Sequence, residues 1–468
     1  MHLLPPTGPP RLSLQRGVAL LAAAFAPPSG VHRRTVTMTT PCVGTTCSEK
    51  LSGYATTMRG HWILRPAAAL DQIVPELGGD KHKGQLGRVG VFGGSEEYTG
   101  APFFASMSAL RMGADLTYVF TAKEAAPALK VYSPELMVTP VYSADSLPSD
   151  STGGSADPSR ADRGDDKDNA NNSRVHTLAG RPIADAVASR LPKLHSLLLG
   201  PGMGRHPAVA AAAARVVSRA REASLPVVLD ADAIAMVVAD PGAVRGFRPA
   251  VLTPNANEFR LLCERMEADG YGDDDRGGER ETKKKALAGG VGGPVVGARQ
   301  RAGGEGLPPP PSGTEGAGRG RGGSTAAPAS RSSGPRPGPS PDKALQVERL
   351  ARFLGGVTVV LKGRVDIISD GSRTVACEVP GGLKRCGGIG DVLSGAMATA
   401  LAWVNLQNFG GEEAEELRLW AVWWACAVTR RASRRAFEAK GRATSATDVF
   451  EAVGGVFEEV SPSPTVED

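Results

Sequence analysis

Residues 380–395 read PGGLKRCGGIGDVLSG, and the rest of the chain is organised around this stretch. Six of its residues are glycine, and its only acidic residue, Asp391, stands between Gly390 and an apolar run with helical spacing. Glycine allows positive φ and a close approach of the backbone to a ligand, while the first turn of a helix presents unpaired N–H groups to an anion. We therefore expect a phosphate-binding loop, although a glycine turn followed by a capping aspartate can also be purely structural.

Asp391 is the candidate general base of this loop. A carboxylate beside an anion-binding turn is a poor phosphate ligand, because like charges repel. It is better suited to accept the proton of a hydroxyl group that is being phosphorylated. Lys384 and Arg385, a few residues before it, add positive charge to the loop.

The composition indicates one large globular domain with additions that cannot pack. Of 468 residues, 41% are hydrophobic and 22% are charged, which is ordinary, but the 59 glycines and 36 prolines are concentrated in particular segments. A formal net charge of +5 is small for this length and argues against a dedicated nucleic-acid surface. The six cysteines form no metal-ligand spacing with the seven histidines, so we expect reduced thiols.

The first 48 residues have the composition of a targeting presequence. They contain four arginines and no acidic residue, and their apolar run at residues 18–26 is too short to span a bilayer. The segment AAAFAPP resembles the bipartite plastid presequences of algae with secondary plastids, and a mitochondrial presequence is the alternative. Translation from Met38 or Met58 would leave a cytoplasmic form.

Two segments are predicted to be low-complexity insertions in a single domain at residues 59–463. Residues 142–174 are rich in Ser, Asp, Asn and Gly, and residues 270–340 in Gly, Pro, Arg and Ser. Neither has enough apolar residues to form a core, so we expect both to be disordered.

The remaining chain alternates apolar strands and amphipathic helices. Residues 89–92 form a predicted strand, which a glycine turn, a helix at 102–112 and a second strand ending at residue 120 follow as a βαβ unit. Further short strands are expected at residues 197–199, 227–229, 250–252 and 357–361, each ending in a glycine or polar cluster. This pattern predicts an α/β fold with a mostly parallel sheet, in which ligands bind outside the carboxyl ends of the strands.

Two of these strand ends carry candidate ligand-binding groups. Asn255 and Glu258, three residues apart at the start of a helix, lie on one face and could order water around Mg²⁺, or they could simply cap the helix. Lys362 and Gly363, after the strand at 357–361, could bind nucleotide phosphates, or Lys362 could be an exposed hairpin charge.

Seven motifs occur in order outside the two insertions: KGQLGRVGVFGGSEEYTGAP, LGPGMG, DADA, LTPNANEF, VVLKGRVD, LKRCGGIGD and GRATSATD. In this succession the chain resembles the ATP-dependent NAD(P)H-hydrate dehydratases, a branch of the ribokinase-like superfamily. The resemblance runs from about residue 62 to residue 460, and the ordered set of motifs makes it specific. It implies a ribokinase-like three-layer α/β/α fold.

The resemblance also implies an activity: ATP phosphorylates the hydroxyl group of hydrated NADH or NADPH (the S-epimer of NADHX or NADPHX), and loss of phosphate regenerates the reduced cofactor. The hydrated dinucleotide would be held by Gly204, Asn255, Ala256, Asn257, Glu258, Phe259, Arg260, Leu261 and Asp391, with Mg²⁺ bound through water by Glu258. ATP would be held by Lys362, Gly363, Arg364, Val365, Asp366, Gly381, Gly382, Leu383, Lys384, Arg385, Cys386, Gly387, Gly388, Ile389 and Gly390.

One position departs from the family pattern, since Ile389 stands where glutamine is more usual; the glycines and Asp391 are kept. The NAD(P)HX epimerase domain to which relatives are fused is not expected before residue 62, so the epimerase would be a separate chain. No nucleic-acid or membrane partner is expected, and a homo-oligomer is compatible with the resemblance. The alternatives are a small-molecule kinase of the same fold, acting on a vitamin precursor or a sugar, and an inactive nucleotide-binding module.

Overall fold

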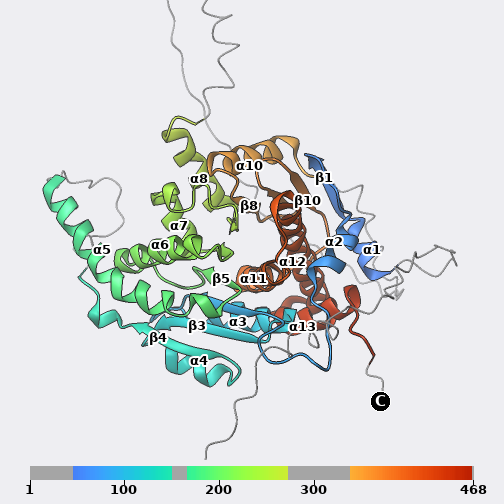
Figure 1. Ribbon diagram of the computed structural model, residues 1–468, viewed down its shortest axis with the longest axis horizontal. Coiled ribbons are helices and arrows are strands. Elements are labelled where there is room, and N and C mark those ends of the chain that lie inside the picture. Colours follow the sequence, from blue (N-terminus) through green and yellow to red (C-terminus); the bar gives the residue numbers. More distant parts are fainter. Residues whose placement is uncertain (1–45, 150–165, 272–337, 466–468) are drawn as a thin grey trace, which may run out of the picture. The chain divides into compact units, whose positions relative to one another are not determined.

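A central ten-stranded sheet organises the part of the chain that the computed structural model describes, residues 46–149, 166–271 and 338–465 (Figure 1). Its strand order is β1-β10-β9-β8-β7-β6-β5-β2-β3-β4. The six pairings from β8 to β4 are parallel and the three from β1 to β8 are antiparallel, so the predicted mostly parallel sheet is confirmed. The strands are β1 (Ala55–Arg59), β2 (Arg88–Phe92), β3 (Leu116–Ala122), β4 (Met137–Tyr142), β5 (Ser196–Leu199), β6 (Val227–Leu229), β7 (Ala250–Leu252), β8 (Thr358–Leu361), β9 (Asp366–Ser369) and β10 (Thr374–Cys377).

Helices cover both faces of the sheet and complete the predicted α/β/α architecture. In β5, Leu198 packs into one apolar core, whereas Leu197 and Leu199 pack into a second core on the opposite face. The first core includes residues of α1 (Cys47–Ser52), α2 (Pro66–Ile73), α3 (Gly100–Met112), α4 (Ala126–Tyr132), α11 (Ile389–Leu406), α12 (Gly411–Lys440) and α13 (Ala446–Val460). The second includes residues of α5 (Asp166–Ala188), α6 (Pro207–Glu222), α7 (Asp232–Ala239), α8 (Ala256–Ala268) and α10 (Pro341–Phe353).

Helix α11, which follows the glycine loop, lies in the middle of the first core. A Cβ atom added at Gly395 would lie 2.0 Å from the carbonyl oxygen of Ala105, so glycine lets α11 approach α3 closely. By length and composition α11 could cross a membrane, but 72% of it is buried inside the protein, as in the core helix of a soluble domain. Its apolar character therefore has a packing explanation.

Two tryptophans of helix α12 donate hydrogen bonds to neighbouring elements, one to the sheet and one to α2. The indole N–H of Trp423 donates to the carbonyl oxygen of Ala376 on β10 at 3.1 Å, and that of Trp424 donates to the carbonyl oxygen of Pro66 at 2.8 Å. Ser445 and Asp448 form a capping box at the start of α13. The five described cysteines have free thiols, as expected.

Several predicted boundaries need correction. The sheet begins before residue 59, because β1 pairs with β10 from Ala55 onward. The expected insertion at 142–174 overlaps regular structure at both ends, since β4 ends at Tyr142 and α5 begins at Asp166. Residues 1–45, 150–165 and 272–337, which hold most of the presequence and of the two insertions, lie outside the described residues.

Candidate functional site

A cleft with a volume of about 480 Å³ lies at the carboxyl ends of the parallel strands. Asp230 follows β6, Asn255 follows β7 and Lys362 follows β8, and all three line this cleft together with the loop that precedes α11. The expectation that the polar strand ends meet in one crevice is therefore confirmed. The amino end of α11 also faces the cleft, and its unpaired N–H groups favour an anion there.

Gly388 sets the path of the chain into α11. It is the residue before the helix, with a φ of 93°. A Cβ atom there would lie 2.8 Å from the ring of Phe104 and 2.6 Å from Cβ of Ala446, so glycine is required both by conformation and by space. This turn places Asp391 in the first turn of α11, where its side chain lines the cleft.

The carboxyl group of Asp391 has an unusual affinity for protons. Burial raises its pKa to about 8, the nearby carboxylate of Asp230 adds to the rise, and Lys362 opposes it. Within the described residues Asp391 forms no ion pair. Once it has lost its proton, a half-buried carboxylate with a raised pKa and no ion-paired cation is a stronger proton acceptor than an ordinary aspartate, which supports the predicted role of general base.

Lys362 is held inside the cleft by Asp230. Its Nζ lies 2.6 Å from Oδ1 of Asp230, whose side chain is 2% exposed and which also accepts a hydrogen bond from Thr253 Oγ1 at 2.7 Å. Burial by itself would lower the pKa of Lys362, but Asp230 raises it overall, so the ammonium group is charged. The alternative that Lys362 is an exposed hairpin charge is thus wrong.

Asn255 and Glu258 form the capping box that the sequence offered as an alternative to a metal site. Oδ1 of Asn255 accepts from the N–H of Glu258 at 3.0 Å, and Oε2 of Glu258 accepts from the N–H of Asn255 at 2.8 Å. Burial raises the pKa of Glu258. Its Oε1 makes no hydrogen bond to any described residue and the side chain lines the cleft, so capping leaves one oxygen available.

The donor set of the cleft fits Mg²⁺ bound largely through water. Glu258, Asp230 and Asn255 supply the hard oxygen atoms that this ion prefers, and Mg²⁺ commonly keeps several of its waters. In the described ranges no group of three His, Cys, Asp or Glu side chains is close enough to hold a metal ion by itself. Glu258 therefore remains the residue that we expect to orient the hydrated ion.

Arg430 of α12 is a site residue that sequence reasoning missed. Its Nε lies 2.6 Å from Oδ2 of Asp366, and its other nitrogens donate to Oδ1 of Asp366 and to the carbonyl oxygens of Gly363 and Arg364. Arg430 thereby fixes the loop after β8 against α12. The only signal in the sequence is a pair of arginines, Arg430 and Arg431, directly after the apolar part of α12.

The structure divides the predicted site residues into three groups. Those that line the main cleft are Asn255, Glu258, Lys362, Gly363, Asp366, Gly381, Arg385, Cys386, Gly387, Gly388, Ile389, Gly390 and Asp391. A neighbouring cavity of about 300 Å³, which shares Lys362 and Gly363 with the cleft, is lined by Ala256, Phe259, Arg364 and Val365. Neither cavity is lined by Gly204, Asn257, Arg260, Leu261, Gly382, Leu383 or Lys384.

Local contacts account for much of the third group. The N–H of Gly204 donates to Oδ2 of Asp232 at 2.9 Å, and Arg260 donates to Oδ1 of Asn257 at 3.1 Å along the exposed face of α8. Lys384 Nζ donates to the carbonyl oxygen of Arg442 at 2.6 Å, so this lysine ties the glycine loop to the segment before α13. Leu383 is 83% exposed.

Further residues of the cleft come from positions that the sequence did not single out as binding residues. Besides Asp230 and Arg430 they are Ala231, Leu393, Cys426, Thr429 and Ser433. Ala231 has a φ of 47°, an uncommon conformation for a residue with a side chain, and it separates Asp230 from Asp232. The DADA motif therefore forms part of the cleft wall through a backbone conformation that its residue types do not reveal.

Comparisons with known proteins show the family of this chain. A family model described as NAD(P)H-hydrate dehydratase matches residues 89–155, 163–293 and 338–454. The ATP-dependent (S)-NAD(P)H-hydrate dehydratase of Neurospora crassa is 37% identical over 396 residues, which cover 83% of this chain and 92% of that protein. The Bos taurus enzyme of the same name is 34% identical over 388 residues, covering 82% of this chain and 86% of its own length.

Two solved structures also align with most of this chain. A crystal structure of ADP/ATP-dependent NAD(P)H-hydrate dehydratase from Bacillus subtilis, co-crystallised with ATP/Mg²⁺, aligns with a TM-score of 0.43 and 16% identity. The alignment covers 84% of this chain and 97% of the other. A ribokinase-like superfamily protein from Enterococcus faecalis aligns with a TM-score of 0.46 over 86% of this chain and 98% of its own.

Proposed function

Since this chain belongs to the NAD(P)H-hydrate dehydratase family, we propose that its cleft holds ATP against the hydroxyl group of hydrated NADH or NADPH and that Asp391 is the base of the reaction. The chain is an enzyme that uses ATP to dehydrate the S-epimer of NADHX or NADPHX, and it thereby repairs damaged nicotinamide cofactors. The observation that carries the assignment of roles is the half-buried carboxyl group of Asp391 at the amino end of α11, which has a raised pKa and no ion pair with a described residue.

In the first step, Asp391 takes the proton of the substrate hydroxyl group. The resulting oxygen attacks the γ-phosphorus of ATP, a new P–O bond forms, and the bond to ADP breaks. The backbone N–H groups at the start of α11 stabilise the negative charge on the transferring phosphoryl group. Mg²⁺, oriented by Glu258, would neutralise charge on the ATP phosphates when bound.

In the second step, the phosphorylated substrate loses phosphate. The C–O bond breaks with its electrons leaving on phosphate, and the ring nitrogen donates an electron pair toward that carbon. The neighbouring ring carbon then gives its proton to the released phosphate, which restores the ring double bond. The products are NADH or NADPH, ADP and phosphate. Since phosphorylation makes the oxygen a good leaving group, the protein needs only to position the groups and to accept the first proton.

The cavity beside the cleft suggests where the remainder of the nucleotide lies. Arg364 and Val365 line it and belong to the predicted ATP-binding segment, whereas Ala256 and Phe259 line it from the predicted substrate segment. Lys362 and Gly363 border both cavities. We propose that ATP extends from the glycine loop past Lys362 into this cavity, so that Ala256 and Phe259 contact ATP rather than the hydrated dinucleotide.

The test of the activity is the near-ultraviolet absorbance of reduced nicotinamide when protein, hydrated NADH, ATP and Mg²⁺ are mixed. We expect growth of this band only with all components present and with one ADP formed for each NADH. Consumption of ATP with accumulation of a stable phosphorylated product would instead indicate a small-molecule kinase. Photolabelling with an azido-ATP should mark the 300 Å³ cavity; labelling confined to α8 residues outside it would contradict the proposed ATP position.

Two further proposals concern the context of the enzyme. Because the reaction takes only the S-epimer, an NAD(P)HX epimerase on a separate chain would supply it. Adding this epimerase to an equal mixture of the R and S epimers should double the yield of reduced nicotinamide. We also propose that residues 1–48, with four arginines and no acid, direct the protein to a plastid or mitochondrion. A fluorescent protein fused after these residues tests this, with a fusion that begins at Met58 as the cytoplasmic control.

A further inference from the structure

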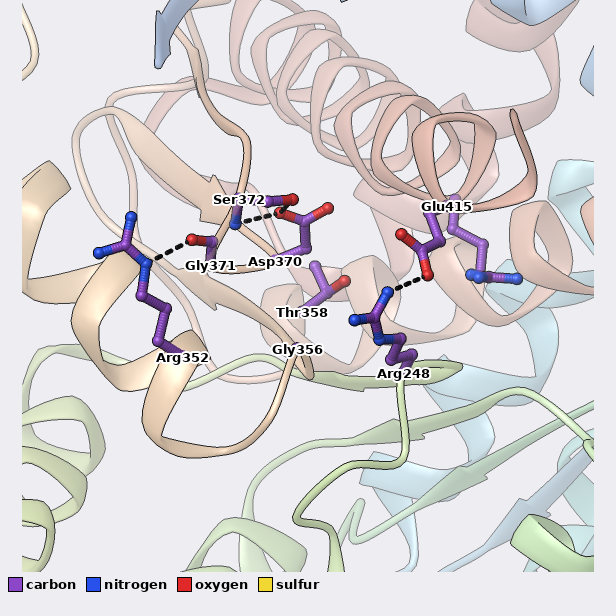
Figure 2. Close-up of a pocket in the computed structure, with 9 residues that line it drawn as sticks. Arg248, Arg352, Gly356, Thr358, Asp370, Gly371, Ser372 and Glu415 are labelled. Carbon is purple, nitrogen blue, oxygen red and sulfur yellow. Dashed lines mark hydrogen bonds and ion pairs between the residues drawn. The ribbon is translucent and has the colours of Figure 1, made fainter. Parts of the chain in front are cut away.

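A second pocket, drawn in Figure 2, lies at the amino end of β8, whereas the catalytic cleft lies at its carboxyl end. Its volume is about 240 Å³, and it is lined by Arg248, Arg352, Gly356, Thr358, Asp370, Gly371, Ser372, Glu415 and Arg418. Thr358 begins β8, whereas Lys362 of the cleft follows its other end. The length of four residues in a strand separates the two sites by roughly 13 Å, so a small ligand in this pocket cannot touch the reacting groups.

The pocket gathers three guanidinium groups and two carboxylates, which leaves one positive charge in excess. Most of these charges are already paired. Arg248 forms an ion pair with Glu415, and Nε of Arg352 donates to the carbonyl oxygen of Gly371 at 2.8 Å (Figure 2).

Asp370 is occupied as well. Its Oδ1 accepts from N and Oγ of Ser372, each at 2.8 Å, and from the N–H of Arg373 at 2.7 Å, while its Oδ2 lies 3.4 Å from Arg373. Asp370 therefore closes the turn between β9 and β10 and has little capacity to neutralise another cation in the pocket.

Arg418 is the exception. It is partly buried in the second turn of α12, yet it makes neither a hydrogen bond nor an ion pair with any residue in the described ranges. Burial lowers its pKa, Glu415 opposes this change and Arg248 adds to it. The nitrogen atoms of Arg418 are not among the buried polar atoms, so its N–H donors face the pocket and are available to a ligand.

We propose that this pocket is a binding site for a phosphate group, distinct from the catalytic cleft, with Arg418 as its principal ligand. A phosphate anion would satisfy the donors of Arg418 and offset the excess positive charge. The planar fork of arginine matches phosphate oxygens in pairs. The volume is below the usual range of about 300–1,000 Å³ for drug-sized ligands, so the ligand is a free phosphate or a small phosphomonoester.

Glu415 is the neighbour expected to limit the affinity of this pocket for phosphate. Glu415 lines the same pocket and is the nearest carboxylate to act on Arg418. It repels an incoming dianion and keeps Arg248 occupied. Removal of the Glu415 charge should therefore strengthen phosphate binding, whereas removal of the Arg418 charge should weaken it.

The test is calorimetric titration of the full chain with inorganic phosphate while a saturating non-hydrolysable ATP analogue occupies the catalytic cleft. We expect binding to the wild type, a loss of affinity of about tenfold or more in Arg418→Gln, and a gain of several-fold in Glu415→Gln. Arg181→Gln, on the exposed side of α5, is the matched control for loss of one positive charge and should bind phosphate like the wild type.

Absence of phosphate binding to the wild type under these conditions would overturn the proposal, and so would equal affinities in the wild type and both pocket variants. If Arg418→Gln does not fold, the opposite shift expected for Glu415→Gln still decides the matter. A parallel titration with glycerol phosphate separates the two sources: tighter binding than phosphate indicates a phosphomonoester, and weaker binding indicates phosphate itself.

Discussion

The catalytic cleft and the arginine pocket, which lie at opposite ends of β8, distribute their charges in opposite ways. In the cleft Lys362 is paired with Asp230 and Arg430 with Asp366, whereas the carboxyl group of Asp391 forms no ion pair with a described residue. In the arginine pocket the carboxylates are paired and Arg418 is left without an anion. The unpaired group indicates the chemistry of each site, a proton acceptor in the first and an anion-binding group in the second.

The largest expected effect comes from removing the unpaired carboxyl group of the cleft. Asp391→Asn keeps the size of the side chain but cannot accept the proton, so kcat should fall about 10²- to 10⁴-fold. Turnover is measured by the appearance of reduced nicotinamide, and thermal unfolding shows whether the variant is folded. Unchanged turnover in a folded variant would remove Asp391 from the role of base.

The paired lysine of the cleft should matter less, and in a way that depends on pH. Lys362→Met should lower kcat about 10²-fold, since one cationic donor to the phosphates is lost. Because Lys362 lowers the pKa of Asp391 and Asp230 raises it, the pH at which activity reaches half its maximum should rise in Lys362→Met and fall in Asp230→Asn.

Lys362→Met and Asp230→Asn control for each other, because their expected pH shifts have opposite signs. In the wild type, kcat/KM should increase with pH through about 8, because Asp391 must lose its proton before it can act as a base. Shifts in the same direction for both variants would show that the charge around Asp391 does not set the pH dependence.

A smaller effect is expected at Arg430, which positions a loop and does not react. Arg430→Gln removes the ion pair to Asp366 and the hydrogen bonds to Gly363 and Arg364. We expect the KM for ATP to rise about tenfold with a smaller change in kcat, since loss of about 1.4 kcal/mol of binding corresponds to tenfold. Arg434→Gln, one turn further along and exposed, is the matched control. A fall in kcat at unchanged KM would contradict the positioning role.

The smallest effect concerns stability. The pKa of Asp391 is raised on folding from 3.8 to about 8, so the folded state binds the proton more tightly than the unfolded state between these values. The free energy of unfolding therefore falls as pH rises through this window, and the stabilising contribution of the protonated carboxyl group is lost above about 8. Asp391→Asn, which is neutral throughout, should be more stable than the wild type at pH 8 by roughly 1 kcal/mol or more. Chemical denaturation at pH 5 and pH 8 checks this, and an equal stability difference at both values would contradict it.

The fold was largely predictable because its elements are local. The predicted strands at residues 89–92, 197–199, 227–229, 250–252 and 357–361 agree with the structure to within a residue, because short apolar runs bounded by glycine and polar residues are typical of buried strands. Strand β4 of the parallel part and strand β10 were not predicted. Strand β1 was missed because its sequence, ATTMR, has no apolar pattern and it is ordered by pairing with β10. Helix α5 begins in a polar stretch that lacks the usual periodicity, which is why its start was placed too late.

The candidate site was predictable where its residues belong to one short motif. The glycine loop and Asp391 are adjacent in the chain, so their relation needs no tertiary information. Asp230 was noticed only as a polar residue at a strand end, because its partner Lys362 is 132 residues away. Arg430 was missed because it lies on α12, and the tryptophans of α12 suggest only a packing role for this helix.

By itself the sequence predicted most of the parallel strands, the glycine turn before α11 and the candidate base, because each depends on residues that are neighbours in the chain. Tertiary structure alone decided what the charged residues do. Arg418 and Arg430 are the same residue type on the same helix, three turns apart. One meets Asp366 at the cleft and becomes a structural clamp, while the other reaches the far end of the sheet, where the nearby carboxylates are already taken.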